Sequence, residues 1–273
     1  MAMNQSIILH EVGKDPHFKI WHAAEMHMFL YTYSDGGNIV CSEKVYPIRS
    51  GALCFVGAGK YHYTMPDEPE HYERSKIFIY PEDLSKIQKV FPDLIAFQKY
   101  SDGGFVYSRI RQDDQPEVER IFRTVEQCQN DPHSNAMLLS CCIQLMILME
   151  QNLEENIIPE SGIIHQAIAY INSNIFREIS ISEVCEAVHI SKYHFCRQFR
   201  QSTGMTVMEY ILKTRIILAK NLLLSEKISV SEVSRKCGFS STSYFCRAFK
   251  ENTGVTPLAF RKEHLSIKQK PFA

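Results

Sequence analysis

The sequence predicts an α+β protein in which a small β-barrel with two trailing helices precedes an all-α domain of two helix-turn-helix units joined by a long helix. Three features of the chain predict this fold. Short β-prone segments separated by turn residues occupy roughly the first eighty residues. Helical periodicity begins after Tyr80, and one helical segment occurs twice. We expect a barrel at 1–110, a helical region at 111–155 and the two helix-turn-helix units at 156–265.

The first strands are defined by aromatic segments and glycine turns. Residues 28–33 are β-prone, and Ser34-Asp35-Gly36-Gly37 can supply the positive φ angles of a hairpin whose second strand is residues 38–44. Further strands are expected at 45–51, 52–56, 61–64 and 74–80. This spacing is typical of a small barrel or sandwich.

Helices follow, with one more strand between them. Residues 81–91 have a helical apolar face, and residues 104–110 are expected to add a strand. Two longer helices are predicted at 116–129 and 134–154, the second with a broad apolar stripe of Leu138, Cys141, Leu145 and Leu148. The stripe either forms a dimer surface or packs on the barrel, and the sequence leaves both readings open.

Charge divides the chain at a polar segment, residues 154–162, which contains Pro and Gly and is the best candidate linker. Residues 160–273 contain 16 Lys and Arg, 9 Glu and no Asp, a net charge of +7, whereas the preceding residues contain 14 basic and 22 acidic side chains, a net charge of −8. A basic half suits a polyphosphate partner, and an acidic half is repelled by one.

Cysteine usage and hydropathy bear on location. The nine cysteines form no CxxC pair and have neither disulfide-framework nor zinc-site spacing. No secretory signal pattern is found at the start, and no apolar run reaches the ~18 residues that a membrane span requires. We therefore expect a reducing, cytoplasmic location without membrane contact.

The repeated segment runs from Ser191 to Gly204 and returns from Ser241 to Gly254. Each copy places two phenylalanines four residues apart on an inward face and ends at a glycine suited to positive φ. Short first helices are expected at 182–188 and 231–237, followed by the turns His189-Ile190 and Gly238-Phe239. Because these first helices align at an offset of 49 rather than 50, the second turn contains one extra residue.

A connecting helix is expected at 207–224, where apolar residues recur at helical spacing. At ~1.5 Å per residue it is roughly 27 Å long, which can hold two recognition helices about one DNA turn (~34 Å) apart. The repeat therefore predicts binding of double-stranded DNA through two adjacent segments of the major groove.

Residues on the outward faces of the two recognition helices are the candidate DNA contacts. They are Tyr193, His194, Cys196, Arg197 and Arg200 in the first helix, and Thr242, Ser243, Cys246, Arg247 and Lys250 in the second. Arg197 and Arg247 are equivalent, and arginine can pair bidentately with guanine O6 and N7. The alternative for both is a phosphate contact, which positions the protein without reading sequence.

These helices resemble the DNA-binding domain of the AraC/XylS family of bacterial transcription regulators over residues 161–261. The residues that carry the resemblance are Arg215, Ala219, Leu222-Leu223, Gly238-Phe239-Ser240, Tyr244-Phe245, Arg247, Phe249-Lys250, Gly254-Val255-Thr256-Pro257 and Phe260-Arg261. The resemblance implies a bipartite DNA-binding domain whose recognition residues match Tyr193, Cys196 and Arg197, then Thr242, Ser243, Cys246 and Arg247. Two positions depart from the family pattern: His189, where glycine is frequent and positive φ is required, and Ser234, where alanine is usual.

The strand order around residues 46–53, followed by Tyr61-His62, looks like the cupin-like sensor barrel that many such regulators carry. By that resemblance the barrel binds a small-molecule effector, the helices at 116–154 form a homodimer, and RNA polymerase is a candidate further partner. Tyr31, Tyr33, Tyr61 and His62 are the candidate ligand-binding residues.

We predict no catalytic residue, no metal and no cofactor, because an enzymatic cupin requires an HxH pair and the chain has His62-Tyr63-Thr64. These four histidines, His22, His27, His62 and His71, could still form a metal site if the fold brought their side chains together. Two alternatives therefore remain beside the effector-controlled regulator. One is a metal-dependent cupin enzyme fused to a DNA-binding module, and the other is a regulator controlled by a partner protein, which a barrel interior filled by side chains would favour.

Overall fold

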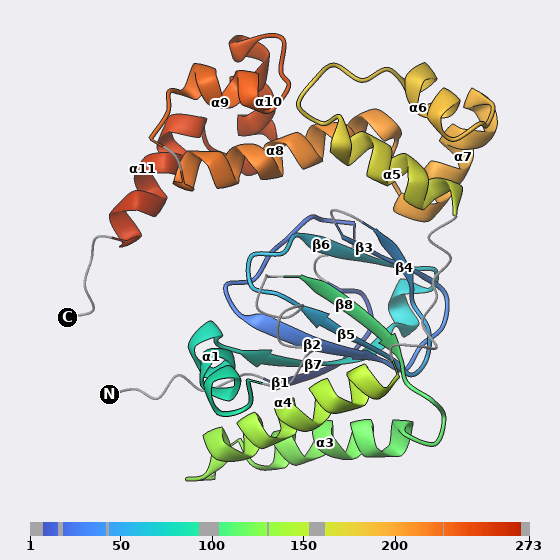
Figure 1. The fold of residues 1–273 in the computed structure, drawn as a ribbon, viewed down its shortest axis with the longest axis vertical. Coiled ribbons are helices and arrows are strands. Elements are labelled where there is room, and N and C mark those ends of the chain that lie inside the picture. The colour runs from blue at the N-terminus through green and yellow to red at the C-terminus, as the bar shows by residue number, and fades with distance from the viewer. Residues whose placement is uncertain are drawn as a thin grey trace. The chain divides into compact units, whose positions relative to one another are not determined.

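The computed structural model describes residues 8–15, 19–41, 44–92, 104–129, 131–152, 162–225 and 227–268 (Figure 1). The chain divides into two compact parts, Met1–Glu160 and Ser161–Ala273, which we call the amino-terminal and carboxy-terminal parts. Residues 154–161, which make up most of the predicted linker, lie outside the described residues.

The amino-terminal part is built on antiparallel strands, and the predicted α+β class is confirmed. In the described residues the strands form two sheets rather than one closed barrel. The larger sheet consists, in spatial order, of β1 (Ile8–Val12), β7 (Glu73–Ile79), β2 (His27–Thr32), β5 (Ala52–Val56) and β8 (Phe105–Arg109). The smaller sheet consists of β4 (Val45–Pro47), β3 (Gly37–Cys41) and β6 (His62–Pro66).

The predicted hairpin between residues 28–33 and 38–44 is wrong. Gly36 and Gly37 do have positive φ angles, of 96° and 92°. However, β2 pairs with β5 and β7, whereas β3 pairs with β4 and β6. A Cβ on Gly37 would lie 2.2 Å from the carbonyl oxygen of Met65, so this glycine allows the chain to cross from one sheet to the other against β6. This crossing separates the two sheets.

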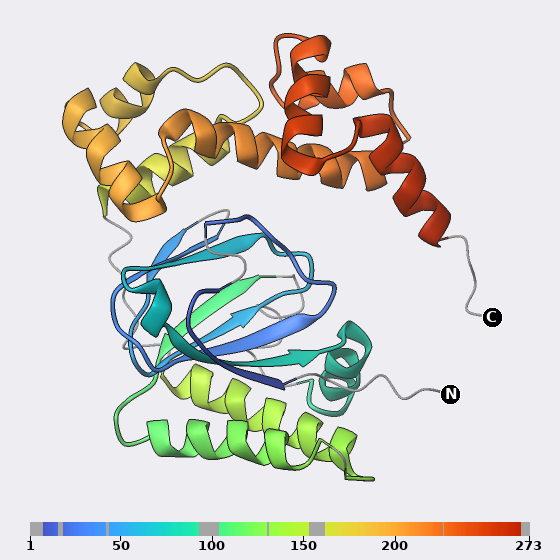
Figure 2. The same cartoon turned by 180° about the vertical axis from the view of Figure 1, so that it is seen from behind.

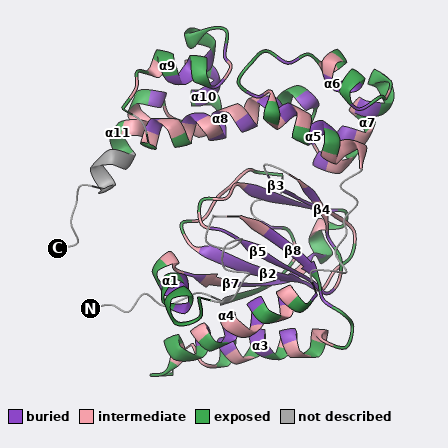
Figure 3. Ribbon diagram, viewed as in Figure 1, coloured by how far each residue is buried: buried purple, intermediate pink, exposed green. Residues whose placement is uncertain are grey.

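Side chains on β2 and β5 alternate between two cores, which is why both strands are buried at every position. Phe29, Tyr31, Leu53 and Phe55 belong to the core shared with the helices. The alternate residues face the smaller sheet, where they pack with Ile39 and its neighbours. Buried side chains from both sheets therefore pack together between them, and Figure 3 shows the strands of both sheets coloured mainly as buried.

Three helices cover the outer face of the larger sheet: α1 (Pro81–Val90), α3 (Gln115–Gln127) and α4 (Ser134–Gln151). Figures 1 and 2 show α3 and α4 side by side along this face. Leu138, Cys141 and Leu145 are buried in the shared core, and Leu148 packs against it. Of the two readings of this stripe, packing on the sheet is therefore the one that the structure shows.

Charged side chains fill one region of the larger sheet. Arg74 is 1% exposed, and its Nη2 lies 3.0 Å from Oε2 of Glu11. Lys76 Nζ lies 2.9 Å from the same oxygen and 3.2 Å from Oδ2 of Asp15. Two cations and two carboxylates thus neutralise one another, which a buried charge requires.

The carboxy-terminal part is helical. Its elements are α5 (Ile163–Ser173), α6 (Ile181–Ala187), α7 (Lys192–Thr203), α8 (Val207–Ser225), α9 (Val230–Lys236), α10 (Thr242–Thr253) and α11 (Pro257–Lys268). Helix α8 is the predicted connecting helix and contacts α7 on one side of the repeat and α9, α10 and α11 on the other. No helix among the described residues is long and apolar enough to span a membrane.

Candidate nucleic-acid interface

Both helix-turn-helix units begin with the same capping arrangement. Ser180 Oγ accepts a hydrogen bond from the backbone N–H of Glu183, whose carboxylate accepts one from the N–H of Ser180. Ser229 and Glu232 repeat this capping box at the start of α9. The hydrogen bond from the Ser180 backbone, with the Arg177 guanidinium, lowers the pKa of Glu183 to about 2. The local sequence Ser-x-x-Glu therefore fixes where α6 and α9 begin.

The turns of the two units have the same backbone conformation but different residues. His189 has a φ of 54° and Gly238 a φ of 75°. His189 therefore adopts the positive φ predicted for it. A Cβ added to Gly238 would lie 2.7 Å from the carbonyl oxygen of Ile175, whereas His189 is exposed. The second turn thus lies against neighbouring backbone at Gly238, whereas the first turn is open to solvent at His189.

The recognition helices α7 and α10 present one buried and one exposed face. Phe195, Phe199, Phe245 and Phe249 are completely buried, as their spacing predicts. Both helices end at a left-handed glycine, Gly204 with φ 68° and Gly254 with φ 83°. The structure thus uses the same internal scaffold twice.

All ten candidate DNA contacts lie on α7 or α10. Exposed residues are Tyr193, His194, Arg197 and Arg200 on α7 and Thr242, Ser243, Arg247 and Lys250 on α10, while Cys196 and Cys246 are half-buried. Tyr193 is 76% exposed, an unusual exposure for an aromatic side chain in a folded protein. Each helix therefore displays a polar and cationic face, and its contact with DNA remains a prediction.

The two equivalent arginines have different surroundings. The Arg247 guanidinium carbon lies 5.7 Å from the ring centre of Tyr244, a cation–π arrangement. His194 occupies the position equivalent to Tyr244, and among the described residues no comparable contact of Arg197 occurs. Arg247 thus has an aromatic neighbour on its own helix that Arg197 lacks in the described part of the chain.

Arg215 on α8 links the segment between α5 and α6 to the turn of the second helix-turn-helix unit, a role that the sequence analysis did not assign to it. Its Nε donates to the carbonyl oxygen of Ile175 over 3.1 Å, and its Nη2 donates to that of Arg177. Its guanidinium carbon also lies 5.8 Å from the ring centre of Phe239 in the second turn. The pattern Arg215-x-x-x-Ala219 is visible in the sequence, but the sequence could not identify the partners of Arg215, because they lie far away in the chain.

The four candidate ligand residues are not brought together in one place. Tyr31 and Tyr33 meet edge to face, with ring centres 4.9 Å apart, at the larger sheet. Tyr31 is 1% exposed and belongs to the core. His62 lies in the smaller sheet, with Tyr61 directly before that strand. Burial raises the pKa of Tyr33 and Tyr61, so both phenols stay neutral at physiological pH.

Only two of the four histidines considered for metal binding meet. The His22 and His62 rings lie 4.1 Å apart, whereas His27 stacks on Phe55 and His71 lies beside Glu68. No group of three or more His, Cys, Asp and Glu side chains suited to a metal ion occurs in the described part of the chain.

Comparison with known proteins identifies the same region. Residues 184–263 match a family model described as a helix-turn-helix domain. The HTH-type transcriptional activator RhaS of Enterobacter sp. (strain 638) is 23% identical over 227 residues, which cover 82% of this chain and 80% of that protein. The HTH-type transcriptional activator RhaR of Mannheimia succiniciproducens is 23% identical over 248 residues, 89% of this chain and 87% of that protein.

Solved structures give weaker similarity. ToxT from Vibrio cholerae O395 is 13% identical, with a TM-score of 0.38, over 94% of this chain and 96% of that chain. The DNA-binding domain of AdpA, crystallised with a target DNA, is 23% identical, with a TM-score of 0.38, over 40% of this chain and 97% of that one. TM-scores of this size do not by themselves establish a shared overall fold.

Proposed function

We propose that this chain is a DNA-binding transcriptional regulator of the AraC type, like the RhaS and RhaR activators to which it is similar, and that it reads one asymmetric duplex site with α7 and α10. The supporting observation is the repeated scaffold with unlike surfaces. Tyr193 and His194 stand where the second helix has Ser243 and Tyr244. Two different recognition surfaces on one chain favour a site with two unlike halves.

Arg197 and Arg247 are the residues proposed to read bases, by bidentate pairing with guanine. Both are exposed on the outward faces of their helices, and Arg247 is oriented by Tyr244. Arg200 and Lys250, one turn further along, are proposed to contact phosphate.

The experiment begins with selection of a binding duplex from a random-sequence library by the full chain. Fluorescence anisotropy then gives the affinity of wild type, Arg197→Ala and Arg247→Ala. Loss of one base contact should cost about 1–3 kcal/mol, roughly 5- to 150-fold, and relax preference at one position only. Arg120→Ala, in the amino-terminal part, is the matched control.

Unchanged affinity of both recognition-helix variants would contradict the proposal. If the variants instead lose the same affinity for every duplex, and the slope of log affinity against log salt concentration falls by about one, the arginines contact phosphate rather than bases.

Control of this activity is proposed to lie in the amino-terminal part, through a small-molecule effector, with the chain acting as a cytoplasmic homodimer that contacts RNA polymerase. The activator names of the relatives support an action on transcription. The filled interior between the sheets is the arrangement expected of a regulator controlled by a partner protein, so a small effector requires a different site. Light scattering of the purified chain tests the dimer, with a monomeric mass as the contrary result.

A further inference from the structure

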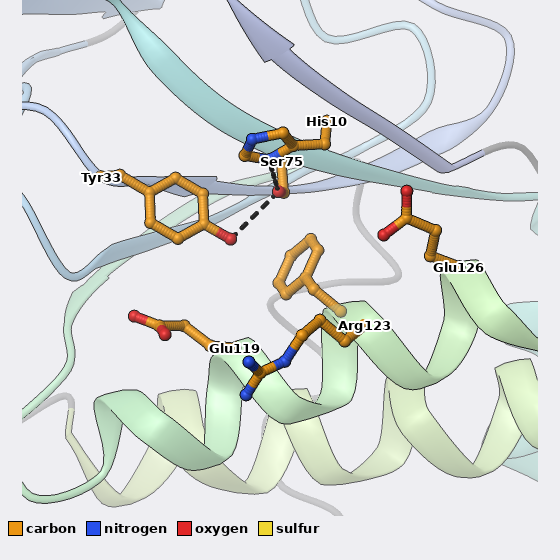
Figure 4. Close-up of a pocket in the computed structure, with 7 residues that line it drawn as sticks. His10, Tyr33, Ser75, Glu119, Arg123 and Glu126 are labelled. Atoms are coloured by element: carbon orange, nitrogen blue, oxygen red, sulfur yellow. Dashed lines mark hydrogen bonds between the residues drawn. The ribbon is translucent and has the colours of Figure 1, made fainter.

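A pocket of about 260 Å³ opens between α3 and the larger sheet, on the face opposite the side-chain-filled interior (Figure 4). Its lining residues are His10 on β1, Tyr33 after β2, Ser75 on β7, and Glu119, Phe122, Arg123 and Glu126 on α3. The volume lies just below the ~300–1,000 Å³ typical of small-molecule sites, so a compact ligand fits it.

One wall of the pocket is an ordered set of hydrogen-bonding groups. Ser75 is 3% exposed, and its Oγ lies 3.1 Å from the Tyr33 hydroxyl and 2.9 Å from Nδ1 of His10. His10 Nε2 lies 3.5 Å from a carboxylate oxygen of Glu73. Because burial raises the pKa of Tyr33, its neutral hydroxyl can still accept a hydrogen bond from a ligand or donate one to it. The hydrogen bonds to Ser75 thus position the Tyr33 hydroxyl and the His10 ring along this wall.

The opposite wall consists of three charges on one face of α3. Glu119, Arg123 and Glu126 are spaced four and three residues apart, which is roughly 6 and 4.5 Å along the helix axis. Within the described part of the chain, none of the three forms a hydrogen bond or an ion pair. Other surface arginines of this part do pair, such as Arg120 with Glu117 and Arg111 with Asp114. Glu119 is half-buried, and Arg123 and Glu126 are exposed, so charges of both signs line one solvent-open pocket.

We propose that this pocket binds a free amino acid as the effector. Arg123 binds the carboxylate in the forked geometry that guanidinium favours. Glu119 and the Tyr33 hydroxyl bind the ammonium group, and the buried Phe122 ring packs against the apolar part. The inference rests on the proposed control of this regulator by a small molecule and names its site and chemical class.

Other small ligands match the pocket less well. A dicarboxylate would be repelled by Glu119 and Glu126, and a diamine would leave Arg123 opposed by a like charge. A neutral sugar would leave charges of both signs without partners. Only a ligand with separated positive and negative groups matches both signs.

The test uses the full chain without DNA, so that its result is independent of DNA recognition. Thermal unfolding is followed through the fluorescence of Trp21, the single tryptophan, which lies in the amino-terminal part. The probes are the twenty standard L-amino acids singly, with succinate, putrescine and glucose. An amino acid at about ten times its Kd should raise the Tm by roughly 3–6 °C, and titration calorimetry should give one site per chain.

Matched variants locate the site. Glu119→Gln and Arg123→Gln should each weaken binding at least tenfold while leaving the ligand-free Tm within a degree or two, because neither residue pairs with another described residue. Glu150→Gln on α4 is the control and should bind like wild type. Absence of binding by all twenty amino acids would overturn the proposal, as would binding of only succinate, putrescine or glucose, or equal binding by both pocket variants and wild type. None of these results bears on Arg197 or Arg247.

Discussion

Substitutions at the two equivalent turn positions should change stability in opposite directions. Gly238 and His189 have the same backbone conformation, with φ of 75° and 54°. Gly238→Ala should destabilise the second helix-turn-helix unit, whereas His189→Gly should slightly stabilise the first. The difference comes from what surrounds each residue, since a Cβ at Gly238 would lie 2.7 Å from the Ile175 carbonyl oxygen and 2.9 Å from the Phe176 carbonyl carbon.

The magnitude follows from three contributions. A left-handed conformation costs a non-glycine residue about 1–2 kcal/mol, and replacing glycine returns about 0.4–1 kcal/mol through the unfolded state. The clash with the Ile175 backbone adds about 1–3 kcal/mol for Gly238→Ala, so the three contributions give a net loss of about 1–4.6 kcal/mol. His189→Gly involves only the first two contributions, so it should gain between about 0 and 1.6 kcal/mol.

Hydrogen exchange of the full chain, read by mass spectrometry on peptides from α6 to α10, measures each unit separately. In Gly238→Ala, exchange should accelerate in α9 and α10 and in residues 175–177. In His189→Gly, exchange of α6 and α7 should slow or stay the same. Similar effects of the two substitutions would refute the reasoning, because the surroundings of Gly238 would then be irrelevant.

Three further predictions concern the same domain. Arg215→Met loses the hydrogen bonds to two carbonyl oxygens. It should therefore weaken DNA affinity more for the two-part site than for a duplex containing one half-site. Equal losses of affinity for the two duplexes would contradict the linking role of Arg215. Tyr244→Leu should lower DNA affinity about two- to fivefold by releasing Arg247, since a cation–π contact at an exposed site contributes about 0.5–1 kcal/mol, whereas Tyr244→Phe should stay within twofold of wild type. The pKa of Glu183 is lowered to about 2, so the capping interaction of its carboxylate stabilises α6 fully above the ordinary pKa of 4.5, and this stabilisation is lost as the pH falls toward 2. Amide exchange at the start of α6 should therefore rise between pH 4.5 and 2 in wild type and not in Glu183→Gln.

The architecture of the DNA-binding helices could be predicted because its signals are local. Paired phenylalanines four residues apart and terminal glycines each act within one or two helical turns. The sequence also predicted the positive φ of His189 and the long connecting helix, which spans Val207–Ser225. These features depend on neighbours in the chain, and all of them are found in the structure.

In the amino-terminal part, strand pairing and helix packing depend on residues that are far apart in the chain. Gly36 and Gly37 indicate a turn, but whether the next strand continues the same sheet depends on the distant residues Met65 and Pro66. The stripe on α4 identified an apolar face without identifying what it packs against.

By itself the sequence predicted the repeat, the two recognition helices with their outward arginines and the helix that connects them, because helical periodicity is a short-range effect. Only the tertiary structure decided that two sheets form, that Arg215 bonds to the segment between α5 and α6, and that Glu119, Arg123 and Glu126 line one pocket with Tyr33 and Ser75. Each of these depends on residues tens of positions apart, whose meeting is set by the packing of whole elements.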